Sequence, residues 1–316
     1  MMGITVLTIL AHLVAAPAGP ADTSGTGELA LSREIVLREL PCRKLEVGTN
    51  KFEVCSPKGT ARILDGHIIE LFGKFKPAVE SLCSCKYTLP GIVVLKDEVQ
   101  LAIASGLDVT TVTSSGMRGT CLDGVIYLVS PGAYPMGYDW MSVLGHEMIH
   151  HLVGQITSSK LPLWFEEGMA WTYQELWIRG QTKKLSDADR GLLGQMHGNG
   201  KLGSWSELLR SFSLAGSADR ARLFYLQSAV AVRLILERKG DLFGICRELE
   251  AGGDFWEAIK RATGQSRHRY QSRVELLWAR APTRTERRLA AVERGFGDDR
   301  QKERFDTMIR ISDLLW

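Results

Sequence analysis

The sequence predicts an α+β fold in which a small mixed sheet with a helix precedes a mainly helical half. Two β-branched runs, residues 91–96 and 124–130, indicate strands, and both fall in the first half of the chain. Apolar side chains recur at helical spacing over residues 61–81, which indicates a helix beside these strands. From Trp140 onward the pattern is that of helices separated by loops. The length of 316 residues suits one large domain or two modest ones.

The N-terminus has the pattern of an export signal. Residues 4–16 are mostly apolar, and the small residues Ala16-Pro17-Ala18 follow directly. A helix of that length covers about 20 Å, which is too short for the roughly 30 Å of a bilayer core. We therefore expect residues 1–21 to be a cleaved signal peptide and the protein to be exported, to the periplasm or the extracellular space. A membrane contact is expected only if this segment stays uncleaved.

The rest of the chain divides into three parts where the pattern changes. Residues 22–135, which open with a Ser/Thr/Gly-rich linker, form the α+β part. Residues 136–280 form the helical part of the same unit, and residues 281–316 form a helical C-terminal extension.

A β-hairpin is the first element of the α+β part. The short runs Lys44-Leu-Glu-Val47 and Lys51-Phe-Glu-Val54 alternate around Gly48-Thr49-Asn50. Folding the hairpin about this turn brings Cys42 nearly opposite Cys55, so we expect a disulfide between them. Six cysteines fit an oxidising compartment. Buried free thiols are an equal alternative for the other four, Cys83, Cys85, Cys121 and Cys246.

The elements that follow are predicted from local signals. Pro77 is expected to end or kink the helix at residues 61–81. Residues 98–104 read as a short helix after the first strand, and the Gly-rich residues 106–119 read as a loop.

Composition and charge exclude one class of partner. Hydrophobic residues make up 45% of the chain and charged residues 24%, as in an ordinary soluble globular protein. The net charge of +3 is too mild for nucleic-acid binding, and no basic tract carries interleaved aromatics. We expect no nucleic-acid partner. Nothing in the sequence indicates an oligomeric state.

Residues 144–151, LGHEMIHH, carry the main candidate for chemistry. Asp139 suits the N-cap of the helix that contains them. His146 and His150 are four residues apart, so both imidazoles lie on one face and can reach one ion at roughly 2.0–2.1 Å. Glu147 lies about 100° round the helix, where it can lean toward a water on that ion without ligating it. The alternative is an amphipathic helix whose histidines are satisfied by ordinary hydrogen bonds.

A second stretch, LPLWFEEGMA at residues 161–170, adds a pair of carboxylates. Pro162 suits the start of a helix that can pack against the first. Gly168 and Ala170 are small, which lets the two helices approach closely. Two histidines and a carboxylate from a neighbouring helix make a three-ligand zinc site with an open fourth position, the arrangement used in catalysis. The expected cofactor is Zn²⁺.

HEMIH followed by WFEEGMA resembles the gluzincin metallopeptidases, whose pattern is HExxH and then a helix with W-x-x-E-G-x-A, and small bacterial peptidases of that type in particular. The resemblance implies a thermolysin-like catalytic core. It gives the role of third zinc ligand to Glu167, with 16 residues between it and His150, and it leaves Glu166 beside the ligands or facing solvent. It also implies that the strand at residues 124–130 is the sheet edge that pairs with an extended substrate.

The resemblance further implies a mechanism. Zn²⁺ held by His146, His150 and Glu167 polarises a water and the scissile carbonyl together. Glu147 is the expected general base, which accepts the proton of the water and passes it to the departing amine.

An oxyanion donor is the remaining part of that mechanism. Because family members place a Tyr on a later helix facing the zinc, Tyr225, in a stretch that resembles their Y-x-Q-S helix, is the candidate. Tyr173 is the runner-up, and a half-buried aromatic with a satisfied hydroxyl is the alternative for both. His151 points off the ligand face. The other histidines are expected to be structural or surface residues, and these include His67, His197 and His268.

The predicted function is zinc-dependent hydrolysis of peptide bonds in exported or extracellular peptides or proteins. Aminopeptidases normally need an acidic anchor for the amine of the substrate, and Gly116-Met117-Arg118 lies in roughly that region without an acid. Endopeptidase action is therefore expected. The alternatives are a catalytically silent peptide-binding module that retains the zinc site and an exported structural protein without metal.

Overall fold

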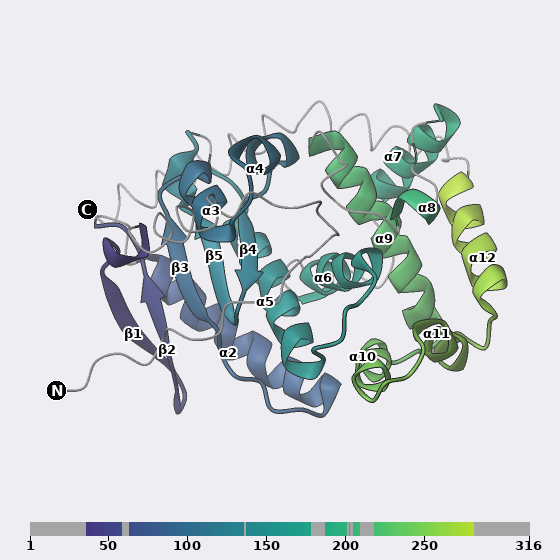
Figure 1. Cartoon of the computed structure of the whole chain (residues 1–316), viewed down its shortest axis with the longest axis horizontal. Coiled ribbons are helices and arrows are strands. Elements are labelled where there is room, and N and C mark those ends of the chain that lie inside the picture. The colour runs from purple at the N-terminus through teal and green to yellow at the C-terminus, as the bar shows by residue number, and fades with distance from the viewer. Residues whose placement is uncertain are drawn as a thin grey trace, which may run out of the picture.

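A mixed five-stranded sheet forms one half of the molecule, as predicted (Figure 1). The computed structural model describes residues 36–58, 63–135, 137–177, 187–200, 202, 205–208 and 218–280. The strands, in chain order, are β1 (Cys42–Val47), β2 (Asn50–Cys55), β3 (Gly91–Leu95), β4 (Gly119–Leu122) and β5 (Val125–Val129). Their spatial order is β1-β2-β3-β5-β4. β2, β3 and β5 run parallel, whereas β1 and β4 pair antiparallel with their neighbours.

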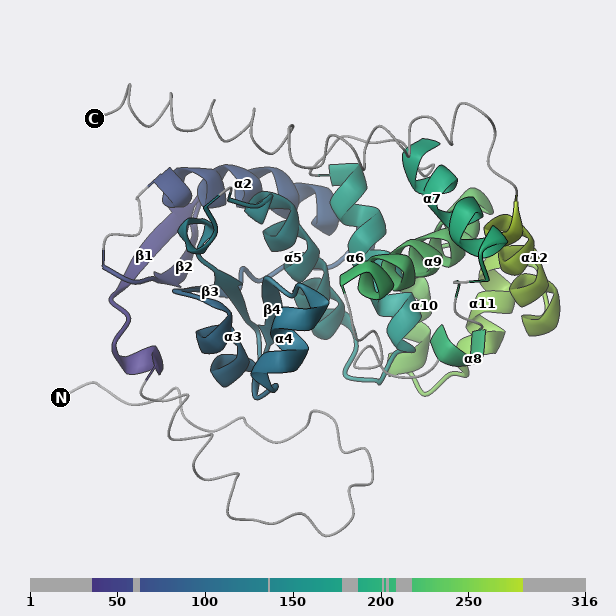
Figure 2. The ribbon, with the colours of Figure 1, turned by 90° about the horizontal axis from the view of Figure 1, so that it is seen from above.

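Alternating side chains divide the two faces of the sheet between two sets of helices. Ile92 and Val94 of β3, with Ile126 and Leu128 of β5, pack toward α2 (Ile63–Cys83) and α5 (Trp140–Ile156). The alternate residues of the two strands, Val93 of β3 with Tyr127 and Val129 of β5, pack toward α3 (Glu98–Ser105) and α4 (Val109–Ser115). Figure 2 shows the sheet between these two layers. Successive side chains of β3 and β5 thus point to opposite faces of the sheet, and helices bury both faces.

The predicted hairpin and its disulfide are confirmed. β1 and β2 pair in a register that sets Cys42 opposite Cys55, and the two form a disulfide. The turn between them contains Gly48, whose φ of +60° is readily adopted only by a residue without a Cβ. A second disulfide joins Cys83 and Cys85, while Cys121 and Cys246 are free thiols.

The structure differs from two expectations about local structure. Pro77 does not end α2, which continues through it to Cys83. Val79 and Cys83 are buried in the core, so packing of this last part outweighs the hydrogen bond that proline cannot make. The expected loop at residues 106–119 contains α4, which Asp108 caps by accepting a hydrogen bond from the Thr111 amide.

The prediction of the edge strand is also wrong. The strand at residues 124–130 corresponds to β5, which lies inside the sheet between β3 and β4. The edge beside the helical half is the four-residue strand β4. The edge implied by the resemblance therefore exists, but the preceding segment of the chain supplies it.

The second half of the described chain is helical, as predicted (Figure 1). After the short 3-10 turn Pro131–Ala133 and α5, its helices are α6 (Leu163–Trp177), α7 (Asp187–Gly198), α8 (Trp205–Leu208), α9 (Ala218–Glu237), α10 (Leu242–Glu250), α11 (Phe255–Thr263) and α12 (Arg267–Ala279). One hydrophobic core runs from α2 and the sheet through α5, α6 and α9 to α12. The two halves thus share a core around α5 and α6.

Some predictions fall outside the described residues. These are the signal peptide at residues 1–21, the linker that follows it and the extension at residues 281–316. The division between residues 22–135 and 136–280 stays a prediction. Among the described helices, none has the length and apolar composition needed to cross a bilayer.

Candidate metal centre and catalytic site

The site begins with α5, whose start is fixed as the sequence predicts. The Asp139 carboxylate caps the helix by accepting a hydrogen bond from the Ser142 amide at 3.2 Å. Most of the helix from Leu144 to Val153 is buried between the sheet and the helical half. A buried helix face is a rigid support, so the side chains of His146, Glu147 and His150 project from a well-fixed backbone.

The structure brings together the three predicted ligands, His146, His150 and Glu167. His146 Nε2 lies 3.1 Å from His150 Nε2 and 3.1 Å from Glu167 Oε2. His150 Nε2 lies 3.5 Å from the same oxygen. Tetrahedral ligands at roughly 2.0–2.1 Å from a zinc ion stand about 3.3–3.4 Å apart. The nitrogen and carboxylate donors therefore fit a zinc ion in both chemistry and spacing.

The second nitrogen of each imidazole has a partner that orients the ring. Glu166 Oε1 accepts a hydrogen bond from His150 Nδ1 at 3.0 Å, and Gln174 Oε1 lies 3.2 Å from His146 Nδ1. With Nδ1 protonated, each ring turns its Nε2 lone pair toward Glu167. This contact shows that the Glu166 side chain points toward His150, one of the two orientations that the sequence left open for it. Gln174 was missed, although its position seven residues after Glu167 places it two turns along the same face of α6.

The acidic side chains make this site favourable for positive charge. Burial acts to lower the pKa of His150, but Glu167 and Glu166 outweigh it and raise the pKa well above its ordinary value. Burial acts to raise the pKa of Glu167, but His150 and His146 outweigh it and hold the pKa below its ordinary value. The same carboxylates would stabilise a metal cation between these side chains.

Glu147 has a different environment from Glu167. It is only 6% exposed, and burial raises its pKa. His150 and His146 oppose this rise, while the carboxylates of Glu167 and Glu166 add to it. A carboxylate with a raised pKa holds a proton more readily, which suits a general base near neutral pH.

Edge strand β4 lies in direct contact with Glu147. A Cβ atom at Gly119 would stand 3.2 Å from Glu147 Cγ, 2.8 Å from Val143 Cγ1 and 2.9 Å from Leu128 Cδ2. Only a residue without a side chain lets the strand pass this close to α5. β4, the last strand of the sheet among the described residues, therefore passes directly beside the candidate general base.

Tyr225 is the tyrosine whose ring lies against His146, one of the candidate ligands. Its ring meets the His146 ring edge-on, with centroids 5.6 Å apart. Burial raises the pKa of Tyr225, and Glu167 and Glu147 add to the rise, so the hydroxyl keeps its proton at neutral pH. Tyr173, the runner-up, instead stacks on Phe243 of α10 at 5.3 Å.

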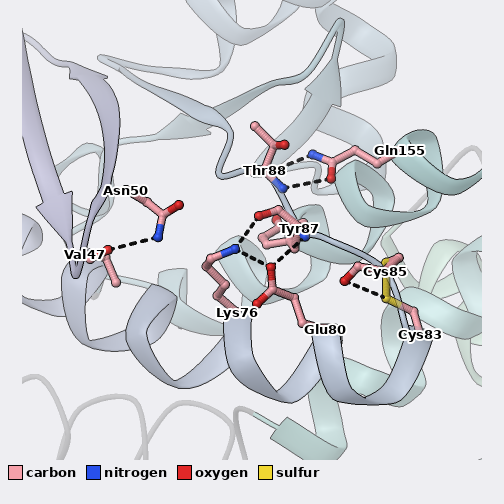
Figure 3. A network of polar contacts seen from close by, with 9 residues as sticks. All are labelled: Val47, Asn50, Lys76, Glu80, Cys83, Cys85, Tyr87, Thr88 and Gln155. Carbon is pink, nitrogen blue, oxygen red and sulfur yellow. Dashed lines mark hydrogen bonds and ion pairs between the residues drawn. A yellow bond between two sulfur atoms is a disulfide. The ribbon is translucent and has the colours of Figure 1, made fainter.

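His151 has a structural contact beside the site, to the segment that follows α2. Its Nδ1 lies 3.1 Å from the Tyr87 hydroxyl. Figure 3 shows how the segment around Tyr87 is held: Lys76 donates to the Tyr87 carbonyl at 2.6 Å, and Gln155 of α5 makes two hydrogen bonds with the backbone of Thr88. The segment after α2 is thereby fixed to the end of the motif helix.

The small residue Gly168 has a role other than the predicted one. It was expected to admit α6 close to α5, but it faces α9, where a Cβ would stand 2.5 Å from the Ser228 carbonyl oxygen. At Gly168, α6 therefore comes close to the backbone of α9, the helix that carries Tyr225.

No protein-family model matches the sequence, and no curated protein matches it. Among solved structures, the M1 zinc metallopeptidase from Deinococcus radiodurans aligns at 13% identity with a TM-score of 0.43, covering 77% of this chain and 52% of that chain. A mutant of the M1 zinc metallopeptidase from that organism gives 12% identity and a TM-score of 0.43, with 77% and 53% covered. A two-domain M1 zinc metallopeptidase mutant bound to L-arginine gives 13% and 0.40, with 77% and 52% covered. The chain spans about half the length of these structures. A likeness of this size carries no argument about activity.

Proposed function

We propose that this protein is an exported zinc-dependent peptidase with a thermolysin-like catalytic core, and that it acts as an endopeptidase on peptides or proteins. The observation that carries the proposal is the triangle of His146 Nε2, His150 Nε2 and Glu167 Oε2, with separations of 3.1, 3.1 and 3.5 Å. Glu147 stands beside this triangle on the same helix. Ligands without an adjacent base would support metal storage or a structural metal equally well.

Each side chain has a distinct role in the proposed reaction. Zinc, when bound, supplies a Lewis acid that polarises water and a carbonyl oxygen. Glu147 takes a proton from the attacking water and returns it to the departing amine. Tyr225 donates a hydrogen bond to the negative oxygen that develops on the attacked carbonyl. The free edge of β4 offers backbone N–H and C=O groups to an extended substrate.

Charge at the start of β4 supports endopeptidase action. Arg118 precedes Gly119, and its guanidinium pairs with Glu98 at 2.7 Å and lies over the Tyr134 ring. The Glu98 carboxylate is engaged by Arg118 and by the Tyr134 hydroxyl, so it does not serve as the acidic anchor that an aminopeptidase needs for the free α-amine of its substrate. An internal stretch of peptide carries no such charge and needs no anchor.

Metal analysis and cleavage of a peptide library test the proposal. We expect one zinc per chain, cleavage at internal bonds, and loss of cleavage with a chelator that zinc reverses. Glu147→Gln should keep its zinc and lose turnover by at least about 100-fold, since it removes the proton acceptor. Glu70→Gln, which removes an exposed carboxylate paired with Lys74, is the matched control and should stay active.

Two results would contradict the proposal. Zinc binding with peptide affinity but no cleavage would establish the silent peptide-binding module instead. Full turnover in Glu147→Gln would remove that residue from its role.

A further inference from the structure

A stacked pair of aromatic rings stands next to the ligand triangle. The rings of Trp171 and Tyr225 have centroids 5.4 Å apart and an interplanar angle of 17°. The Tyr225 ring in turn meets His146 edge-on at 5.6 Å and 87°. The indole is therefore in contact with a ring that lies against a candidate ligand. Such contacts contribute specific orientation in addition to burial.

Helix α6 supplies both the indole and the ligand carboxylate. Trp171 follows Glu167 by four residues, so the two side chains lie on one face, a turn apart. Any shift of α6 moves both together. The position of the indole relative to the ligands is thus fixed by the helix itself.

The backbones of α6 and α9 are locked close to this pair. Gly168 lies between Glu167 and Trp171 in sequence, and a Cβ there would stand 2.5 Å from the backbone oxygen of Ser228. Ser228 lies three residues after Tyr225 on α9. With both backbones fixed at this contact, the remaining freedom of Tyr225 is rotation of its side chain, and the indole face limits that rotation.

The indole N–H does not explain why a tryptophan stands here. Trp171 Nε1 is buried and has no hydrogen-bond partner in the described part of the chain. A buried donor without an acceptor costs free energy. The contribution of Trp171 is therefore the flat face of its ring, which another aromatic side chain can replace.

We propose that Trp171 is a positioning residue that holds the Tyr225 ring in the orientation needed to donate its hydroxyl toward the substrate carbonyl. This inference deepens the proposed function and rests on it for the role of Tyr225. It does not require Trp171 to touch the substrate or the metal.

Kinetics of single and double variants test the inference. Trp171→Phe keeps a flat ring and removes the unpaired N–H, so it should retain kcat within about threefold. Trp171→Leu keeps an apolar side chain without a ring face, and it should lower kcat by about tenfold or more, with KM and zinc content unchanged. Adding Trp171→Leu to Tyr225→Phe should lower kcat no further than Tyr225→Phe alone. Equal losses in both Trp171 variants, or independent losses in the double variant, would overturn the inference.

A second measurement does not depend on activity. 3-Fluorotyrosine can be incorporated at the seven tyrosines, and the ¹⁹F resonance of Tyr225 is identified by its absence in Tyr225→Phe. We expect one sharp resonance in the wild type and in Trp171→Phe, and a broadened or split one in Trp171→Leu. An equally sharp single resonance in Trp171→Leu would overturn the inference. If the wild type cleaves no peptide, the proposed function fails, while this measurement still decides whether Trp171 orders the ring.

Discussion

Glu166 Oε1 lies 3.0 Å from His150 Nδ1, on the side of the imidazole away from the atom that faces Glu167. Gln174 holds the corresponding place at His146, with 3.2 Å between Oε1 and Nδ1. One ring is thus supported by a carboxylate and the other by a neutral amide. A carboxylate partner raises the basicity of a ligand more than an amide does, because it stabilises positive charge on the ring.

This asymmetry predicts different effects on zinc affinity. Glu166→Ala removes both the charge and the acceptor, and it should weaken zinc binding by about 10- to 100-fold. Glu166→Gln keeps an acceptor and should cost less than Glu166→Ala. Competition with a chromophoric chelator measures both dissociation constants. Glu257→Gln, at an acid near the start of α11 paired with Lys260, is the control and should bind zinc as the wild type does. Unchanged affinity in Glu166→Ala would show that His150 keeps its orientation without Glu166.

Gly119 provides a second prediction, about the distance between the edge strand and Glu147, the candidate general base. Gly119→Ala places a Cβ within 3.2 Å of Glu147 Cγ and 2.8 Å of Val143 Cγ1, so β4 or Glu147 must move. We expect a loss of about 1–3 kcal/mol in the free energy of unfolding and a fall in kcat/KM. Urea unfolding and peptide cleavage measure the two effects.

Gly154 offers the matched control for that substitution. It lies on α5, the helix that Gly119 of β4 approaches, and a Cβ there has no neighbouring atom within 4 Å. Gly154→Ala should therefore stabilise the helix by about 0.5–1 kcal/mol and leave cleavage unchanged. If Gly119→Ala behaved in the same way, the close approach of β4 to Glu147 would not matter for catalysis.

The sequence predicts those parts of the fold that depend on local signals. Asp139 caps the motif helix, and the alternating runs around Gly48 set Cys42 opposite Cys55. In both cases the determining interactions lie within a few residues along the chain. The same holds for His146 and His150, whose relation is fixed by helical geometry alone.

Two of the wrong predictions, the edge strand and the role of Gly168, concern contacts between segments far apart in the sequence, whereas the helix α4 has local signals. β4 is only four residues long and lacks a β-branched run, so the sequence predicts β5 but not β4 as a strand, and β5 then takes the edge position. Gly106 and Gly116, read as loop residues, are the left-handed C-caps of α3 and α4. The position of Gly168 against Ser228 depends on how α6 packs on α9, which no local pattern records.

The contact between α6 and α9 gives a third prediction. Gly168→Ala puts a Cβ 2.5 Å from the Ser228 carbonyl oxygen, which is backbone and cannot rotate away. The helices must separate, which should cost about 1–3 kcal/mol in the free energy of unfolding. Because Glu167 is the adjacent residue, zinc affinity should fall as well. Gly66→Ala on α2, where a Cβ has no atom within 4 Å, is the control and should lower neither quantity. A fall in stability with unchanged zinc affinity would separate this contact from the metal centre.

The buried imidazole of His151 leads to a fourth prediction, about how the free energy of unfolding depends on pH. Burial lowers its pKa from 6.5 to about 4. The folded protein therefore resists a proton that the unfolded chain takes up below pH 6.5. The contribution of His151 to the free energy of unfolding is thus largest above that pH and falls toward pH 4. Between pH 7 and 5 this one group accounts for about 2 kcal/mol of the fall. His151→Gln, which cannot titrate, should lose about 2 kcal/mol less over that interval in urea unfolding with a chelator present.

The cause of this pH dependence can be checked at the hydrogen-bond partner of the ring. Tyr87→Phe removes the hydroxyl that lies 3.1 Å from His151 Nδ1 but leaves the ring buried. If burial is the cause, Tyr87→Phe lowers the free energy of unfolding by a similar amount at pH 7 and pH 5 and keeps the slope of the wild type. The alternative outcome is that the pH dependence of the free energy of unfolding flattens in Tyr87→Phe as it does in His151→Gln. That result would assign the pKa shift of His151 to the hydrogen bond, because the His151 ring is equally buried in Tyr87→Phe and in the wild type.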